Sequence, residues 1–217
     1  MVQIRTFSLP MALRSVTVAL VLMLSASGSA RAQEFSTFSS RGKGTSSTRF
    51  TAGEYTCTVS VLGDGTCTLP SGRAWKFRLP AEPRGTDIEV LYVVPYGDGM
   101  LLLAEFDDSD SGWGRMVRLQ RGASRPVWSH QLQAFNLVAP VRIGDDVFVA
   151  GLAFAARLDA RTGRFVWSHI GRYEVGDMDA PEHLEISPNR IIVRGRAGGK
   201  QKVDCFARTT GAVTACP

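Results

Sequence analysis

The sequence predicts an all-β fold that is β-propeller-like, with three to four four-stranded antiparallel blades. After residue 50, short apolar runs alternate with turns, and no long run shows the 3.6-residue periodicity of a helix. A strand–turn–strand unit also recurs, and each copy is followed by a second hairpin. Four short strands in about 40–50 residues is the size of one propeller blade. The first hairpins of three copies span residues 88–104, 137–150 and 184–193.

The second hairpin is clearest in residues 157–167. Asp159 can accept hydrogen bonds from turn amides, and Gly163, after Thr162, can take the positive φ that a tight turn needs. The hairpin ends on Trp167, a large side chain that must be buried against a neighbour. The same ending recurs at Trp128, since both indoles are followed by Ser-His. A weaker first unit runs from residue 55 to residue 77, with Trp75 in the place of Trp128.

These residues resemble the repeat of the pyrroloquinoline-quinone-type (PQQ-like) propeller family, which has Asp, Thr-Gly and Trp at this spacing. Residues 158–167 match it well. The copy that ends at Trp128 has Arg121-Gly-Ala-Ser124 in place of the turn. The last copy keeps Thr210-Gly211 and has Ala207 for the Asp and Ala215 for the Trp. The resemblance covers residues 88–217.

The resemblance implies a ring of seven or eight blades, whereas this chain has material for three or four. The blades therefore form either a small closed ring or an open arc, and an open arc exposes sheet edges that a second chain can cover. Quinone-dependent enzymes of similar fold hold the cofactor on the axis of a complete propeller, often near a disulfide between adjacent cysteines. No two cysteines are adjacent here. We therefore predict no bound cofactor and no quinone-dependent activity, with Trp128 and Trp167 packing between blades.

Residues 1–32 have the pattern of a secretory signal peptide. Arg5 and Arg14 precede or flank an apolar run of residues 15–24, and Ala30-Arg-Ala32 has the small-x-small form that is cleaved before Gln33. The run is shorter than the roughly 20 residues of a membrane-spanning helix. We expect an exported protein, periplasmic or extracellular. Three of the 25 Lys and Arg residues lie in this segment, so the formal charge of +5 falls to +2 without it, which gives no electrostatic case for nucleic acid or an acidic membrane.

The remaining chain divides into a flexible Ser/Thr/Gly-rich lead-in, residues 33–49, and a repeat domain, residues 50–217. All four cysteines lie in the repeat domain, and an even number in an exported chain predicts two disulfides. The spacing favours the local pairs Cys57–Cys67 and Cys205–Cys216, because each pair brackets a turn. Pairing of Cys57 or Cys67 with a C-terminal cysteine, which would join the two ends of the domain, stays open.

Several polar groups are candidates for a site. His130 and His169 occupy equivalent positions after Trp-Ser, and His183 is the third histidine. Residues 107–112 resemble the start of a calcium loop, but position twelve is Arg118 rather than Glu, so we interpret them as a solvated acidic loop. Two loops are candidate interaction surfaces, and their acidic residues are Asp107, Asp108 and Asp110 in one and Glu174, Asp177 and Asp179 in the other.

The sequence thus predicts a non-enzymatic binding or scaffolding module that uses repeat surfaces for protein–protein contact in the cell envelope. Another protein or a second copy of the chain is the expected partner if the propeller is incomplete. The alternative is an enzyme or carbohydrate-binding protein with a central pocket between blades. An enzyme would require His183, acidic residues or the His130/His169 pair to converge within about 3–4 Å of one point.

Overall fold

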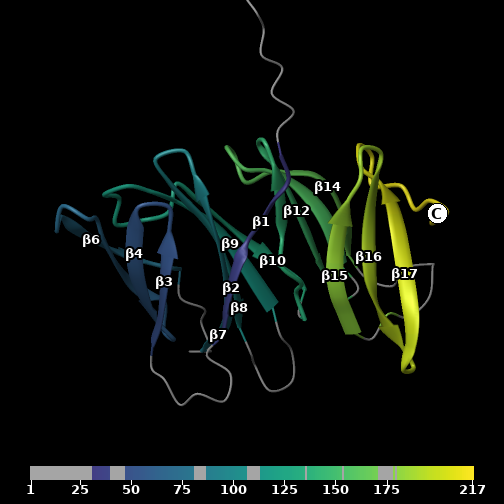
Figure 1. The fold of residues 1–217 in the computed structure, drawn as a ribbon, viewed down its shortest axis with the longest axis horizontal. Helices are drawn as coiled ribbons and strands as arrows, with labels where there is room; N and C mark the ends of the chain where they lie inside the picture. The colour runs from purple at the N-terminus through teal and green to yellow at the C-terminus, as the bar shows by residue number, and fades with distance from the viewer. Residues whose placement is uncertain are drawn as a thin grey trace, which may run out of the picture.

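The computed structural model describes residues 31–39, 47–80, 87–106, 113–134, 136–152, 154–170, 178 and 180–217. The expected signal peptide therefore lies outside the described residues except for its last two positions. Within the described part the chain is all-β and contains no helix, so no helix there could cross a membrane. Four antiparallel sheets stand side by side in a row (Figure 1), and each predicted blade corresponds to one sheet.

Consecutive strands pair in chain order within each sheet. The first sheet holds β3 (Ser47–Ala52), β4 (Tyr55–Ser60), β5 (Asp64–Thr68) and β6 (Ala74–Arg78). The second holds β7 (Ile88–Tyr96), β8 (Gly99–Phe106), β9 (Trp113–Gln120) and β10 (Trp128–Leu132). The third holds β11 (Val141–Ile143), β12 (Asp146–Gly151), β13 (Phe154–Asp159) and β14 (Phe165–Ile170). The fourth holds β15 (Ala180–Ile186), β16 (Arg190–Ala197) and β17 (Lys200–Ala207).

Residues 33–39, which composition assigns to a flexible lead-in, instead form two strands. β1 (Gln33–Glu34) pairs with β11 in the third sheet, and β2 (Ser36–Ser39) pairs with β7 in the second sheet. Phe35, between the two strands, is buried in the core between those sheets. A single large apolar side chain and free strand edges therefore outweigh the Ser- and Thr-rich composition of this segment.

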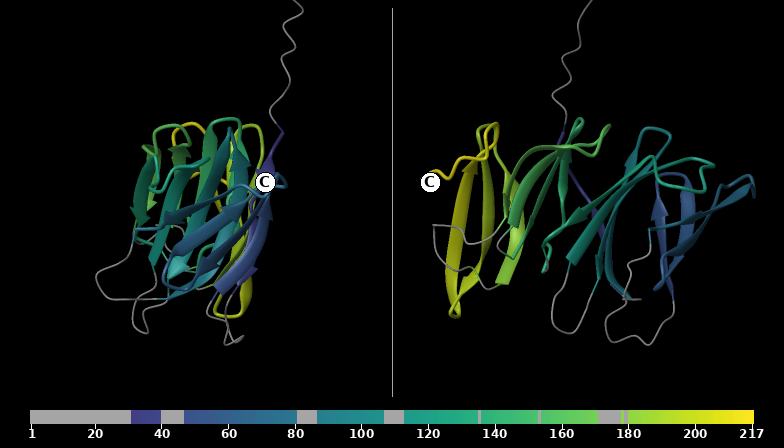
Figure 2. Two further views of the ribbon diagram at one scale, coloured as in Figure 1. Left: turned by 90° about the vertical axis from the view of Figure 1, so that its left-hand side faces the viewer. Right: turned by 180° about the vertical axis from the view of Figure 1, so that it is seen from behind.

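The row of sheets is open rather than closed into a ring. The first and fourth sheets lie at opposite ends of the row in Figure 1 and in the view from behind in Figure 2. One hydrophobic core fills each of the three junctions between neighbouring sheets. The alternative of an open arc is therefore the one that the chain adopts.

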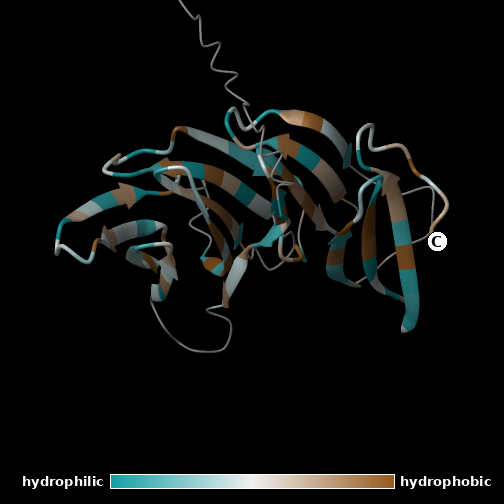
Figure 3. Ribbon diagram, turned by 45° about the horizontal axis from the view of Figure 1, so that its top comes forward, coloured by the Kyte–Doolittle hydropathy of each residue, from teal (hydrophilic) through white to brown (hydrophobic). Residues whose placement is uncertain are grey.

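The two middle sheets are buried on both faces, and their central strands are correspondingly apolar at several successive positions. In β8, Met100 and Leu102 face the first sheet, while Leu101 and Leu103 face the third. In β12, Val147 faces the second sheet, and the next residue, Phe148, faces the fourth sheet. Figure 3 shows hydrophobic bands across the sheets. A continuous apolar run, rather than alternation, is what a strand between two cores requires.

The first sheet alternates, because only one of its faces meets a core. Cys57 and Val59 of β4 are buried against the second sheet, while Thr58 between them is exposed. Thr58 lies opposite Thr66 of β5, and Thr56 lies opposite Thr68, so threonines line the outer face. A terminal repeat with a polar outer face keeps an open array soluble. The described strands at this end of the row therefore present a polar outer face.

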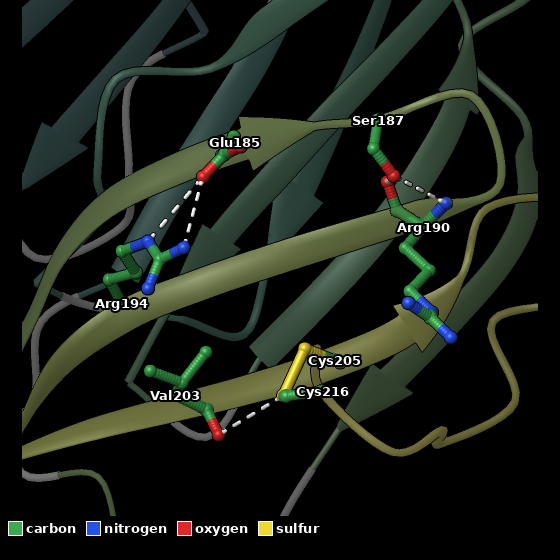
Figure 4. The surroundings of a disulfide bond; sticks show 7 residues. All are labelled: Glu185, Ser187, Arg190, Arg194, Val203, Cys205 and Cys216. Carbon is green, nitrogen blue, oxygen red and sulfur yellow. Dashed lines mark hydrogen bonds and ion pairs between the residues drawn. A yellow bond between two sulfur atoms is a disulfide. The ribbon is translucent and has the colours of Figure 1, made fainter.

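Both disulfides are local, and each braces an end sheet. Cys57 and Cys67 are direct cross-strand partners in the first sheet. Cys205 in β17 is bonded to Cys216, which lies in the chain segment that returns along β17 (Figure 4). This bond lies on the outer face of the fourth sheet, where Ile192 is only 4% exposed. The disulfide and the returning chain thus cover apolar surface of the fourth sheet, on the face where no further sheet packs.

Asp204 is an exception in the fourth sheet because its carboxylate is buried without a hydrogen-bond partner. It is 2% exposed and lies opposite Val193, with Phe206 two residues along the same face. Burial raises the pKa of the Asp204 carboxyl, and the positive charge of Lys202 opposes this in part. An ionised carboxylate without a partner in an apolar setting destabilises the folded state.

We predict that Asp204→Asn raises the free energy of unfolding at pH 7 by about 1–2 kcal/mol, measured by urea titration. Since the folded pKa lies above the unfolded value of about 3.9, the native state binds the proton more tightly. The destabilisation is therefore complete above the folded pKa and disappears as the pH falls to about 4, and the gain from the substitution should shrink over the same interval.

Asp64→Asn is the matched control, since Asp64 is exposed and makes only a surface ion pair, 3.6 Å from Arg78. It should change stability by less than about 0.5 kcal/mol. A gain at Asp204 that does not depend on pH, or a loss of stability there, would contradict the interpretation.

Candidate binding site between the first two sheets

The junction between the second and third sheets is sealed by a tryptophan on a glycine turn. Asp159 Oδ1 accepts hydrogen bonds from the amides of Arg161 (2.8 Å) and Thr162 (3.0 Å), which fixes the turn. Hydrogen bonding from Arg161 holds the pKa of the Asp159 carboxyl below its usual value, so it stays ionised as an acceptor. Gly163 closes the turn with a φ of +70°. The carboxylate of Asp159 and the left-handed backbone of Gly163 thus hold this turn.

Trp128 of the second sheet lies directly on this turn. Its Nε1 donates to the carbonyl oxygen of Ala160 at 3.0 Å. The ring covers Gly163 so closely that a Cβ there would lie 2.5 Å from Trp128 Cδ2. Only glycine therefore fits at this position, both for the backbone conformation and for the space beneath the indole.

The junction between the third and fourth sheets repeats this arrangement. Trp167 Nε1 donates to the carbonyl oxygen of Arg208 at 3.1 Å, and a Cβ on Gly211 would lie 2.6 Å from Trp167 Cδ2. Gly211 has a φ of +74°. The seal forms although Ala207 stands where the third sheet has Asp159. Each of the two indoles therefore packs on the glycine turn of the neighbouring sheet.

The histidines after each Trp-Ser belong to the same seals. His130 packs edge-on against Phe165 with ring centroids 4.3 Å apart, and burial, aided by Arg115, lowers the pKa of His130. His169 packs on Phe206 at 5.4 Å, and its Nε2 lies 2.5 Å from the Gly211 carbonyl oxygen. His183 is exposed on β15. The three histidines therefore do not converge, and no group of three His, Cys, Asp or Glu among the described residues could hold a metal.

The junction between the first and second sheets lacks the seal. The equivalent turn of the second sheet is shorter, because the amide of Ala123 donates to the carbonyl oxygen of Gln120, three residues earlier, at 3.1 Å. A Cβ on Gly122 would meet nothing within 4 Å, so no indole covers this glycine. Trp75 packs edge-on against Tyr55 at 5.0 Å, and its Nε1 is buried without an acceptor. A pocket of about 340 Å³ lies where the seal would be. Its lining residues are Leu69, Arg73, Ala74, Trp75, Arg121 and Gly122.

A second pocket, of about 380 Å³, lies at the same junction and is more apolar. It is lined by Arg78, Leu79, Pro80, Arg125, Pro126 and Ser129. The amide of Arg78 donates to the carbonyl oxygen of Ser124 at 3.3 Å. Residues that precede this pair in each sheet line the smaller pocket, and Arg78 with the residues that follow the pair lines the larger one. We call the two pockets together the first-junction site.

Four exposed arginines border the first-junction site. Arg78 is 3.6 Å from Asp64, and Arg121 is 3.4 Å from Glu54, both as surface pairs of small energetic value. Arg73 and Arg125 make no ion pair with any described carboxylate. The site can therefore attract and hold carboxylate groups, because arginine binds them through two parallel hydrogen bonds.

Only some of the residues that the sequence analysis singles out lie at the first-junction site. Trp75 lines it, whereas the two acidic loops, with Asp107, Asp108, Asp110, Glu174, Asp177 and Asp179, lie outside the described residues. Sequence reasoning missed Arg73, Arg121 and Arg125. The signal was the replacement of Thr-Gly by Arg121-Gly122 in the second copy, which marks a turn that has lost its partner indole.

The fourth sheet is another part of the described chain with several basic residues. On the outer face of the fourth sheet, Arg194 pairs with Glu185 at 3.3 Å (Figure 4), and Arg196 pairs with Glu182 at 2.8 Å. Lys202 lies opposite Gly195 in the register and so on the other face. The basic residues of β16 and β17 are thereby divided between two faces, which leaves the first-junction site as the stronger candidate for an anionic partner.

Comparison with known proteins adds little to what the sheets themselves show. No protein-family model matches the chain, and no curated protein matches it either. A crystal structure of BamB from Moraxella catarrhalis is similar over 84% of this chain and 78% of that chain, at 11% sequence identity and a TM-score of 0.34. A likeness at this level is coarse, so the description of the fold rests on the sheets themselves.

We predict that Gly163→Ala costs about 2–4 kcal/mol of stability, because it adds strain at positive φ and displaces Trp128. Gly122→Ala is the matched control. It has a φ of +76° and open space around a Cβ, so it should cost only about 1 kcal/mol of backbone strain. Urea unfolding of both variants measures the difference, and equal losses would show that Trp128 does not press on the turn.

Proposed function

We propose that this protein is an exported, non-enzymatic binding module that contacts another protein through the first-junction site. One observation carries the proposal. Two of the three junctions are sealed by an indole on a glycine turn, while the first is left open as two pockets bordered by Arg73, Arg78, Arg121 and Arg125. Open, cationic and partly apolar surfaces of this kind suit protein contacts, in which arginine and aromatic residues are enriched.

Export is part of the proposal. The leader pattern of residues 1–32 supports it, and so do the disulfides Cys57–Cys67 and Cys205–Cys216, which persist in oxidising compartments. The turn of Asp159, Thr162 and Gly163 with its covering indole supports membership of the PQQ-like repeat family, as the resemblance implies. A second copy of the chain is less favoured as the partner, since the outer face of the first sheet is polar.

The test is site-specific photocrosslinking in the native host. A benzophenone amino acid replaces Arg125 in the first-junction site or, as a control, Thr58 on the exposed outer face of the first sheet. We expect a discrete heavier adduct only from position 125, with the partner identified by mass spectrometry and the protein recovered from the envelope or the medium. The proposal fails if position 125 gives no adduct, or if both positions give the same ones.

A further inference from the structure

The unsealed junction lacks one specific chemical group. At the two sealed junctions, the turn of the next sheet supplies a carbonyl oxygen to the indole, Ala160 to Trp128 and Arg208 to Trp167. The shorter turn at Gly122 supplies none to Trp75. A buried donor without an acceptor costs about 1–3 kcal/mol, so the first junction carries an unmet demand for an oxygen acceptor.

The charges around the pocket favour an anionic acceptor. Arg73 makes no ion pair with a described residue, and the Arg121 guanidinium lies 5.9 Å above the Tyr55 ring. Glu54 is the opposing charge, 3.4 Å from Arg121, and both side chains are about half exposed. Asp98 is the next acid, tied to Gln120 at 3.2 Å. Glu54 can be displaced from Arg121 at little cost, because exposed pairs of this kind contribute little.

We propose that the Trp75 pocket binds a carboxylate side chain of a partner protein between Arg73 and Arg121. The proposal rests on the proposed function and names the chemistry that the first-junction site recognises. The pocket of about 340 Å³ accommodates one acidic side chain, whose methylene groups pack against Leu69 and Ala74. Charge-assisted bonds from the two guanidinium groups hold the carboxylate.

The Trp75 indole is the third donor to this carboxylate. Its nitrogen is covered from solvent, and the indole itself is only partly buried. A turn about its side-chain bonds brings the N–H toward an oxygen in the pocket and relieves the missing hydrogen bond. Binding of a carboxylate should therefore change the chemical environment of this one indole.

The experiment follows the indole N–H signals of the four tryptophans by ¹H–¹⁵N NMR, assigned with Trp→Phe variants. The ligand is N-acetyl-glutamate N′-methylamide, and N-acetyl-glutamine N′-methylamide is the uncharged control. We expect a saturable shift of the Trp75 signal with the glutamate compound only, at about millimolar concentration. The Trp128 and Trp167 signals should stay in place, because their hydrogen bonds are already made.

Two variants give opposite expected effects. Arg73→Ala should weaken the interaction about tenfold, the usual worth of one charge-assisted bond. Glu54→Gln should strengthen it by about two- to threefold, since it frees Arg121 from its surface partner. Lys76→Ala is the control, since Lys76 is exposed on β6, next to Trp75, and does not line the pocket. Unchanged Trp128 and Trp167 signals report that each variant is folded.

The proposal is overturned if the Trp75 signal does not move, if the glutamine compound shifts it equally, or if Arg73→Ala has no effect. These outcomes are separate from failure of the proposed function. A partner adduct at position 125 without a Trp75 shift removes the carboxylate pocket and leaves the binding module. A selective Trp75 shift without any adduct keeps the pocket and removes the protein partner.

Discussion

The whole molecule depends on how one sheet is held against the next without closing a ring. An indole from the last strand of one sheet lies flat on a glycine turn of the following sheet and donates to a carbonyl oxygen there, at 3.0 Å for Trp128 and 3.1 Å for Trp167. The contact fixes spacing and orientation at the rim of the junction, while the core below supplies most of the burial. Since the next sheet provides both the glycine and the carbonyl, the device can be repeated along the row.

An open row must also solve the problem of its two ends. The middle sheets bury both faces, which is why β8 and β12 are apolar at successive positions. The first sheet turns threonines outward, and the fourth sheet covers Ile192 with the Cys205–Cys216 disulfide. β1 and β2 add to the edges of the third and second sheets and tie the middle of the row together. The first junction, where the seal is absent, is the place left for function.

Much of this organisation could be predicted from the sequence. The Asp159, Thr162 and Gly163 pattern predicts its turn because each residue acts locally, and the Trp-Ser-His copies indicate equivalent contacts. The choice between an open row and a closed ring could not be predicted, because it depends on which sheet faces are covered by residues distant in the sequence. β1 and β2 were missed because strand addition to a free edge needs few apolar residues. The first-junction site was missed because an unsealed junction is visible only against the two sealed ones, and Arg73 and Arg121 are far apart in sequence.

The most direct test of the account is a double-mutant cycle between Trp128→Leu and Gly163→Ala, measured by urea unfolding. If the indole lies on the turn, Gly163→Ala should cost much less once the ring is gone, and the coupling energy should reach about 1–2 kcal/mol. Additive losses, with a coupling energy near zero, would mean that Trp128 and Gly163 do not touch. The sheets would then be held by their cores alone, and the unsealed first junction would have no special meaning.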